Sequence, residues 1–171
     1  MLERFKQITT FIFDVDGVLT NGGIALPGNG HQERTMNIKD GFALQLAVKK
    51  GYRILVLSGG DSQEVVLRLQ KLGISDIHLN IKDKVAEAEK FIHQHQLETK
   101  EILFMGDDLP DLPLMHMAGL PCAPHDAAPE IRTAARYISR YDGGSGCVRD
   151  VIEKVLKLNQ HWQSDVSIAS K

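Results

Sequence analysis

Two aspartates follow an apolar run near the start of the chain, in the stretch FIFDVDGVLT at residues 11–20. Because the side chains of a strand point alternately to its two faces, Asp14 and Asp16 would project on the same side while the strand continues. Two carboxylates held this close repel each other, so they need a cation between them or one must keep its proton. Gly17 lets the chain turn sharply just beyond them. The pair indicates a charged site at the end of a buried strand.

A second acidic segment follows a later apolar run, in the stretch ILFMGDDLPD at residues 102–111. Asp107, Asp108 and Asp111 again stand where an expected strand ends. Oxygen ligands of this kind suit a hard cation, and Mg²⁺ is the natural candidate because it takes a few carboxylates and keeps several waters. The same residues could instead cap a helix that begins near Pro110, and this alternative stays open.

Two further polar elements complete the pattern. Ser58, Gly59 and Gly60 place a hydroxyl group and backbone amides before an expected helix, with Asp61 as its expected N-cap, and a helix start of this kind favours a phosphate. Lys84 lies just inside the next helix, where it can pair with an aspartate and with a phosphate oxygen. Each element alone is more often an ordinary turn, loop or surface residue. All of them together, each after an expected strand, are hard to produce by chance.

The elements that must position these residues alternate along the chain. Short runs rich in Ile, Leu, Val and Phe are typical of strands covered on both faces, and amphipathic segments lie between them. The expected strands are 8–13, 53–57, 76–79, 101–105, 120–122 and 137–138, and the expected helices are 41–50, 62–72, 84–96, 111–118, 129–135 and 148–158. This order predicts an α/β fold, a Rossmann-like three-layer sandwich with a mainly parallel sheet. Ligands of such sheets bind beyond the carboxyl ends of the strands.

Two segments stand outside this alternation. Residues 21–38 are expected to form a β-hairpin, with residues 27–30 as its turn, that projects from the edge of the sheet where the acidic pair lies. Residues 160–171 show little apolar pattern and are expected to form a flexible C-terminal tail. The length of 171 residues and the lack of a linker predict a single domain over 1–171.

Composition narrows the function classes. The net charge of −2 argues against a general nucleic-acid binder, which needs a basic surface. No apolar run approaches the roughly 20 residues of a membrane span, and the first residues lack the apolar centre of a secretion signal. Cys122 and Cys147 are too few for a disulfide framework. These features are typical of a cytoplasmic globular protein.

The polar residues together suit phosphoryl transfer through a covalent intermediate. One carboxylate would attack phosphorus while Mg²⁺ neutralises the phosphate oxygens. A second carboxylate two residues away would protonate the leaving alkoxide and then deprotonate the water that hydrolyses the aspartyl phosphate. Ser58, its neighbouring amides and Lys84 would hold the remaining phosphate oxygens.

These motifs resemble those of the haloacid dehalogenase superfamily of phosphatases. The segment 14–20 is similar to its first motif, Ser58 to its second, Lys84 to its third and the segment 106–111 to its fourth. The resemblance implies that Asp14 is the nucleophile and Asp16 the general acid/base. It implies that Mg²⁺ is held by the Asp14 and Asp107 carboxylates and the Asp16 carbonyl, with Asp108 or Asp111 in the outer shell. The implied substrate-binding residues are Ser58, Gly59, Thr20 and Lys84.

Residues 8–152 resemble in particular the capless branch of this superfamily that acts on phosphates of keto-deoxy sugar acids, such as 3-deoxy-D-manno-octulosonate 8-phosphate. Capless members are similar in forming tetramers in which hairpins and tails close neighbouring active sites. The resemblance thus implies a homotetramer, with residues 21–38 and 143–146 as the closing parts. His31 and Arg34 on the hairpin would then reach a neighbour's site.

One motif departs from this branch. Members that act on the octulosonate phosphate commonly carry Thr-Gly-Arg where this chain has residues 58–60 as Ser-Gly-Gly. The missing guanidinium would suit a substrate carboxylate, and Arg68 or Arg149 is the hypothesised replacement. Relatives of the sialic-acid type, which act on nonulosonate 9-phosphates, also depart from this motif and remain an alternative. The second alternative is a non-catalytic oligomerisation or regulatory module of the same fold.

Overall fold

The computed structural model describes residues 1–28 and 30–162, and its centre is a six-stranded sheet. The strands are β1 (Thr10–Phe13), β2 (Arg53–Leu57), β3 (Asp76–His78), β4 (Ile102–Met105), β5 (Leu120–Ala123) and β6 (Tyr137–Ile138). Their order is β3-β2-β1-β4-β5-β6, and each neighbouring pair is parallel. The expected Rossmann-like α/β class is confirmed, with a sheet that is parallel throughout its described pairings.

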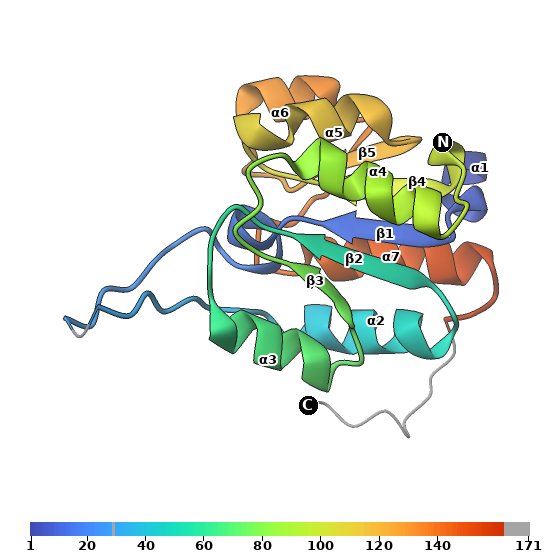
Figure 1. The fold of residues 1–171 in the computed structure, drawn as a ribbon. Coiled ribbons are helices and arrows are strands. Elements are labelled where there is room, and N and C mark those ends of the chain that lie inside the picture. The colour runs from blue at the N-terminus through green and yellow to red at the C-terminus, as the bar shows by residue number, and fades with distance from the viewer. Residues whose placement is uncertain (29, 163–171) are drawn as a thin grey trace.

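Helices cover both faces of the sheet (Figure 1). They are α1 (Leu2–Gln7), α2 (Ile38–Lys49), α3 (Gln63–Lys71), α4 (Lys84–Gln94), α5 (Leu112–Met117), α6 (Pro129–Ala134) and α7 (Cys147–Leu158). The buried side chains of α1, α2, α3 and α7 form one apolar cluster, and those of α4, α5 and α6 form a second on the opposite face. None of the helices in the described ranges is long and apolar enough to cross a membrane.

In the central strand β1, burial on both faces explains why residues 11–13 are all apolar. Phe11 and Phe13 belong to the first cluster and Ile12 to the second, as the alternation of strand side chains requires. All three are at most 1% exposed, because helices cover both faces. β1 also pairs with β2 on one side and β4 on the other, so the ends of these three strands lie together.

Three helix starts differ from the sequence-based expectation. The helix α1 was not expected, since Phe5 is its one buried residue and leaves no apolar period. The helix α2 begins earlier because the Asn37 side chain caps it, accepting from Lys39 N at 2.8 Å. The N-cap of α3 is Ser62 rather than Asp61, with Ser62 Oγ accepting from Val65 N at 3.4 Å.

Residues 21–37, here called the projecting loop, extend away from the carboxyl edge of β1 (Figure 1). The expected β-hairpin is wrong in its pairing, because the arms in the described residues meet only at the isolated antiparallel bridges Thr20–Met36 and Ala25–Glu33. Glycines are frequent in this segment and have no side chain to pack across a strand pair. The result is a two-armed loop rather than a ladder of strands.

The chain after α7 begins by packing on the domain. Trp162 meets Phe42 of α2 edge to face, with ring centroids 6.0 Å apart. His161 Nδ1 lies 2.9 Å from the Tyr52 hydroxyl. Residues 161 and 162 of the expected flexible tail are therefore packed on the domain, and residues 163–171 lie outside the described residues.

Asp40 ties α2 to the start of α7. It is 2% exposed, and its Oδ1 accepts from Arg149 N at 2.7 Å while its Oδ2 accepts from Gly146 N at 3.3 Å. This cap holds the glycine-rich segment 143–146 against the loop that follows β1. A Cβ atom on Gly143 would lie 2.0 Å from the Gly17 carbonyl oxygen, so the two backbones touch.

Replacing Asp40 by alanine is expected to lower the free energy of unfolding by about 1 to 2 kcal/mol, because two N–H groups at the start of α7 lose their acceptor. Urea unfolding at pH 8 measures this, since burial raises the pKa of Asp40 to about 6 and the carboxylate is then charged. Lys39→Ala, an exposed change on the same helix, is the control. Equal stabilities of the two variants would contradict the capping role.

Candidate active site

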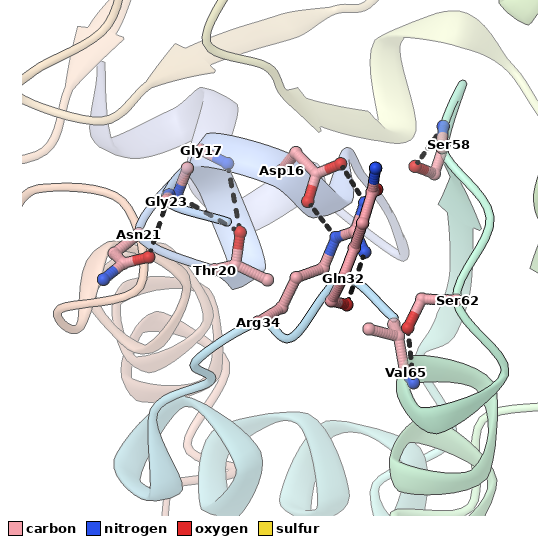
Figure 2. Close-up of polar contacts among 12 residues, drawn as sticks. Asp16, Gly17, Thr20, Asn21, Gly23, Gln32, Arg34, Ser58, Ser62 and Val65 are labelled. Carbon is pink, nitrogen blue, oxygen red and sulfur yellow. Dashed lines mark hydrogen bonds and ion pairs between the residues drawn. The ribbon is translucent and has the colours of Figure 1, made fainter. Parts of the chain in front are cut away.

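Asp14 stands at the carboxyl end of β1, beside the end of β4. Its backbone N–H donates to the Met105 carbonyl at 3.1 Å. The chain then makes a tight turn over Val15–Leu19, in which Gly17 has a φ of 82°. Thr20 closes this turn, with its buried hydroxyl oxygen accepting from Gly17 N and Gly22 N, each at 3.3 Å (Figure 2). The structure thus places Thr20 as a brace of the loop rather than on the cleft wall.

The end of β4 delivers the second group of carboxylates. The 3-10 turn Leu109–Asp111 brings Asp111 back so that its Oδ2 accepts from Asp107 N at 3.0 Å. A Cβ atom on Gly106 would lie 2.5 Å from Asp111 Cβ, so this return needs a glycine there. Asp108 is exposed and caps the turn by accepting from Leu109 N at 2.8 Å. Of the two outer-shell candidates, Asp111 joins the cluster and Asp108 lies at its rim.

Lys84 connects the two groups. Its Nζ donates to Asp14 Oδ1 at 2.8 Å and to Asp111 Oδ1 at 2.7 Å. The side chain starts from the first turn of α4, which Asp83 caps by accepting from Ala86 N at 2.9 Å. Lys84 and Asp14 are each 9% exposed, and Asp111 is 1% exposed. This is a buried charged network in which one cation meets two carboxylates.

A metal ion fits the acidic cluster. Oxygen atoms of Asp14, Asp107 and Asp111 all lie within 4.8 Å of one another. Burial, and then the nearby charge of Asp111, raises the pKa of Asp14 to about 6. Burial, and then the charges of Asp14 and Asp111, raises the pKa of Asp107 to about 7. Three carboxylates with one ammonium group leave negative charge that a hard cation would compensate.

The cluster opens into a cleft of about 360 Å³. Its lining includes eight of the nine site residues expected from the sequence, namely Asp14, Asp16, Ser58, Gly59, Lys84, Asp107, Asp108 and Asp111. The Ser58 side chain accepts from Gly60 N at 3.1 Å, which leaves its hydroxyl hydrogen for a ligand. The cleft therefore combines carboxylates, an ammonium group and neutral donors along one edge of the sheet.

Arg34 is a site residue that sequence reasoning placed elsewhere. It contacts Asp16 of its own chain, with Nε donating to Oδ1 at 2.7 Å (Figure 2). Arg68 lines an adjoining cavity of about 440 Å³ together with Arg34, whereas Arg149 lines a separate one near α7. The positive charge of Arg34, on the loop that follows the acidic pair, is the one feature of the sequence that points to it. An irregular loop has no periodic pattern, so the sequence does not indicate which residue Arg34 contacts.

Comparisons with known proteins show which chains this one is similar to. Residues 70–151 match the family described as haloacid dehalogenase-like hydrolases. The 3-deoxy-D-manno-octulosonate 8-phosphate phosphatase of Escherichia coli strain K12 is 30% identical over 156 residues, which cover 91% of this chain and 83% of that protein. The structure of that phosphatase from Moraxella catarrhalis, in complex with magnesium, phosphate and KDO, has a TM-score of 0.88 at 31% identity and covers 92% of this chain and 90% of that one. The Yersinia pestis phosphatase structure has a TM-score of 0.91 at 28% identity, covering 94% and 86%.

Mg²⁺ is expected to bind more tightly as the pH rises from 5 to 8. The pKa of Asp14 is about 6 and that of Asp107 about 7, so protons compete with the metal below these values. Each competing proton weakens apparent affinity by about tenfold per pH unit below the pKa, and the gain levels off above pH 7. Isothermal titration in buffers of different ionisation enthalpy measures both affinity and proton release.

The stability of the metal-free protein should instead fall as the pH rises. In the folded state the pKa values of Asp14 and Asp107 lie above the ordinary value of 3.8, so the stability that these groups contribute is present at low pH and is lost as the pH rises through 6 to 7. Mg²⁺ should therefore raise the melting temperature more at pH 8 than at pH 5. Glu89→Gln, an exposed change on α4, serves as the control with an unchanged profile. A pH-independent affinity would contradict the assignment of these carboxylates as ligands.

Proposed function

This chain belongs to the haloacid dehalogenase-like hydrolases, in the family of the 3-deoxy-D-manno-octulosonate 8-phosphate phosphatases, and we propose that it is a Mg²⁺-dependent phosphatase of that keto-deoxy sugar acid phosphate. The observation that carries the proposal is the network in which Lys84 joins Asp14 and Asp111 beside Asp107. The related Moraxella catarrhalis structure, with magnesium, phosphate and KDO, supports the choice of metal and sugar acid.

Asp14 is the nucleophile in this proposal. One carboxylate oxygen attacks phosphorus as the bond between phosphorus and the sugar oxygen breaks, which gives an aspartyl phosphate and an alcohol. Lys84 holds Asp14 Oδ1 at 2.8 Å, so the carboxylate keeps one orientation and its second oxygen is available for attack. The cluster keeps the nucleophile nearly dry, with 9% of its side chain exposed.

Asp16 is the general acid/base. Its side chain is 35% exposed, which places it at the opening of the cleft where the leaving group and the attacking water must pass. It donates a proton to the leaving oxygen and then takes one from the water that hydrolyses the aspartyl phosphate. The water's oxygen ends in the released phosphate, and Asp14 is regenerated.

The remaining groups bind the phosphate oxygens and the metal. The Asp14 and Asp107 carboxylates and the Asp16 backbone carbonyl would hold Mg²⁺, with Asp111 behind them. When bound there, the ion neutralises the charge of the phosphate oxygens. Ser58 Oγ–H, the Gly59 amide and Lys84 line the same cleft and supply donors to those oxygens.

Phosphate release from two substrates tests the function. We expect 3-deoxy-D-manno-octulosonate 8-phosphate to be hydrolysed with Mg²⁺ and faster than a nonulosonate 9-phosphate. Asp14→Asn should lose at least about 10³-fold in turnover, as nucleophile removal does elsewhere, whereas Glu89→Gln, an exposed change on α4, should stay near wild type. A preference for the nonulosonate ester would assign a sialic-acid-type reaction, and release from neither would favour a non-catalytic module.

We also propose that the enzyme is a cytoplasmic homotetramer in which the projecting loop contacts neighbouring copies. Ile24 and Leu26 on this loop are 46% and 74% exposed, which is typical of an interface. Light scattering is expected to give four times the mass of one chain. Leu26→Asp should lower that mass, and Leu67→Asp, an exposed leucine on α3, should not. A wild-type protein with the mass of one chain would contradict the assembly.

A further inference from the structure

Arg34 connects the projecting loop to the catalytic cleft of its own chain (Figure 2). Its Nε donates to Asp16 Oδ1 at 2.7 Å, and its Nη2 donates to Oδ2 at 3.2 Å. A guanidinium and a carboxylate that meet at two points share a plane, which a single ammonium contact cannot enforce. The contact therefore sets the orientation of the Asp16 carboxylate as well as its position.

The two partners differ in exposure. The Arg34 side chain is 5% exposed, whereas that of Asp16 is 35% exposed. Arg34 Nη1 also donates to the Gln32 carbonyl at 3.3 Å, so the guanidinium is anchored in its own loop. Arg34 is thus the fixed member of the pair, and Asp16 is the member that faces the cleft.

Gly60 leaves the room that this ion pair occupies. A Cβ atom on residue 60 would lie 3.1 Å from Asp16 Oδ2 and 3.2 Å from Arg34 Nη2. The Gly60 N–H donates to Ser58 Oγ at 3.1 Å, which holds the segment after β2 beside the pair. A side chain at residue 60 would therefore press on both members of the ion pair.

We propose that Arg34 is a positioning residue for Asp16 and that the glycine at residue 60 leaves room for their contact. This inference rests on the proposed function, in which Asp16 protonates the leaving oxygen and later deprotonates water. Arg34 exchanges no proton, because a guanidinium stays charged in proteins. It holds the Asp16 carboxylate in line with the leaving oxygen. Because Arg34 belongs to the projecting loop, the position of this loop affects the orientation of Asp16.

Three variants and one control test the proposal. Arg34→Gln removes the cation, and Arg34→Lys replaces the two-point guanidinium contact by a single ammonium group. Gly60→Ala adds a methyl group that presses on the ion pair. Glu33→Gln changes an exposed charge on the same arm of the loop and is the control. The measurement is the single-turnover rate of phosphoryl transfer. The two substrates are the sugar acid phosphate and p-nitrophenyl phosphate, whose leaving group departs without a proton.

Arg34→Gln is expected to slow transfer from the sugar acid phosphate by about ten- to a hundredfold, a part of what general acid catalysis contributes. Transfer from p-nitrophenyl phosphate should fall much less, because that step does not need the Asp16 proton. Gly60→Ala should show the same selective loss, and Arg34→Lys a smaller one. Glu33→Gln should leave both rates at wild-type values.

Equal slowing of both substrates in Arg34→Gln and Arg34→Lys would overturn the proposal, because a general loss of structure affects both reactions alike. A rise in KM for the sugar acid phosphate alone, at unchanged maximal rates, would also overturn it and would assign Arg34 to binding a substrate carboxylate. Arg34→Lys keeps a cation in the loop, so it gives the answer if Arg34→Gln does not fold. Failure of the proposed function is distinguishable, since the wild-type enzyme would then not transfer phosphate from the sugar acid phosphate.

Discussion

The active-site edge depends on holding acidic side chains closer together than their charges favour. Asp14, Asp107 and Asp111 meet at the ends of β1 and β4, where burial and mutual repulsion raise the pKa of the first two. Lys84 offsets part of this repulsion by contacting two of the three carboxylates. The remaining negative charge is what a divalent cation at this cluster would compensate, so the fit to a metal and the crowding have one origin.

Backbone contacts, more than side-chain packing, maintain this crowding. A Cβ atom on Gly17 would lie 1.9 Å from Asp107 Oδ2, so the loop after β1 rests directly on the carboxylate from β4. Gly106 and Gly143 make similarly close approaches to Asp111 and to the Gly17 carbonyl. The three loops interlock because side chains are absent at these points. A methyl group at any of them would separate the charged groups that the site must keep together.

The sequence predicts the sheet and most of the cleft, because both follow from local patterns. Short apolar runs give most of the strands, and polar residues directly after them must share the carboxyl edge of a parallel sheet. The contact of Arg34 with Asp16 and the bracing role of Thr20 were not predicted, since both depend on the path of an irregular loop. The pairing within residues 21–37 was also misjudged, because glycine-rich arms lack the side chains that specify register.

The strand order carries a consequence for the synthesis of the chain. β1 pairs with β2 and with β4, and Lys84 reaches Asp14 across 70 residues of sequence. A nascent chain that has not yet delivered β4 therefore holds Asp14 and Lys84 without Asp107 and Asp111, the second group of carboxylates. Such non-local contacts form late in folding. The acidic cluster is therefore complete only once the middle of the sheet has closed.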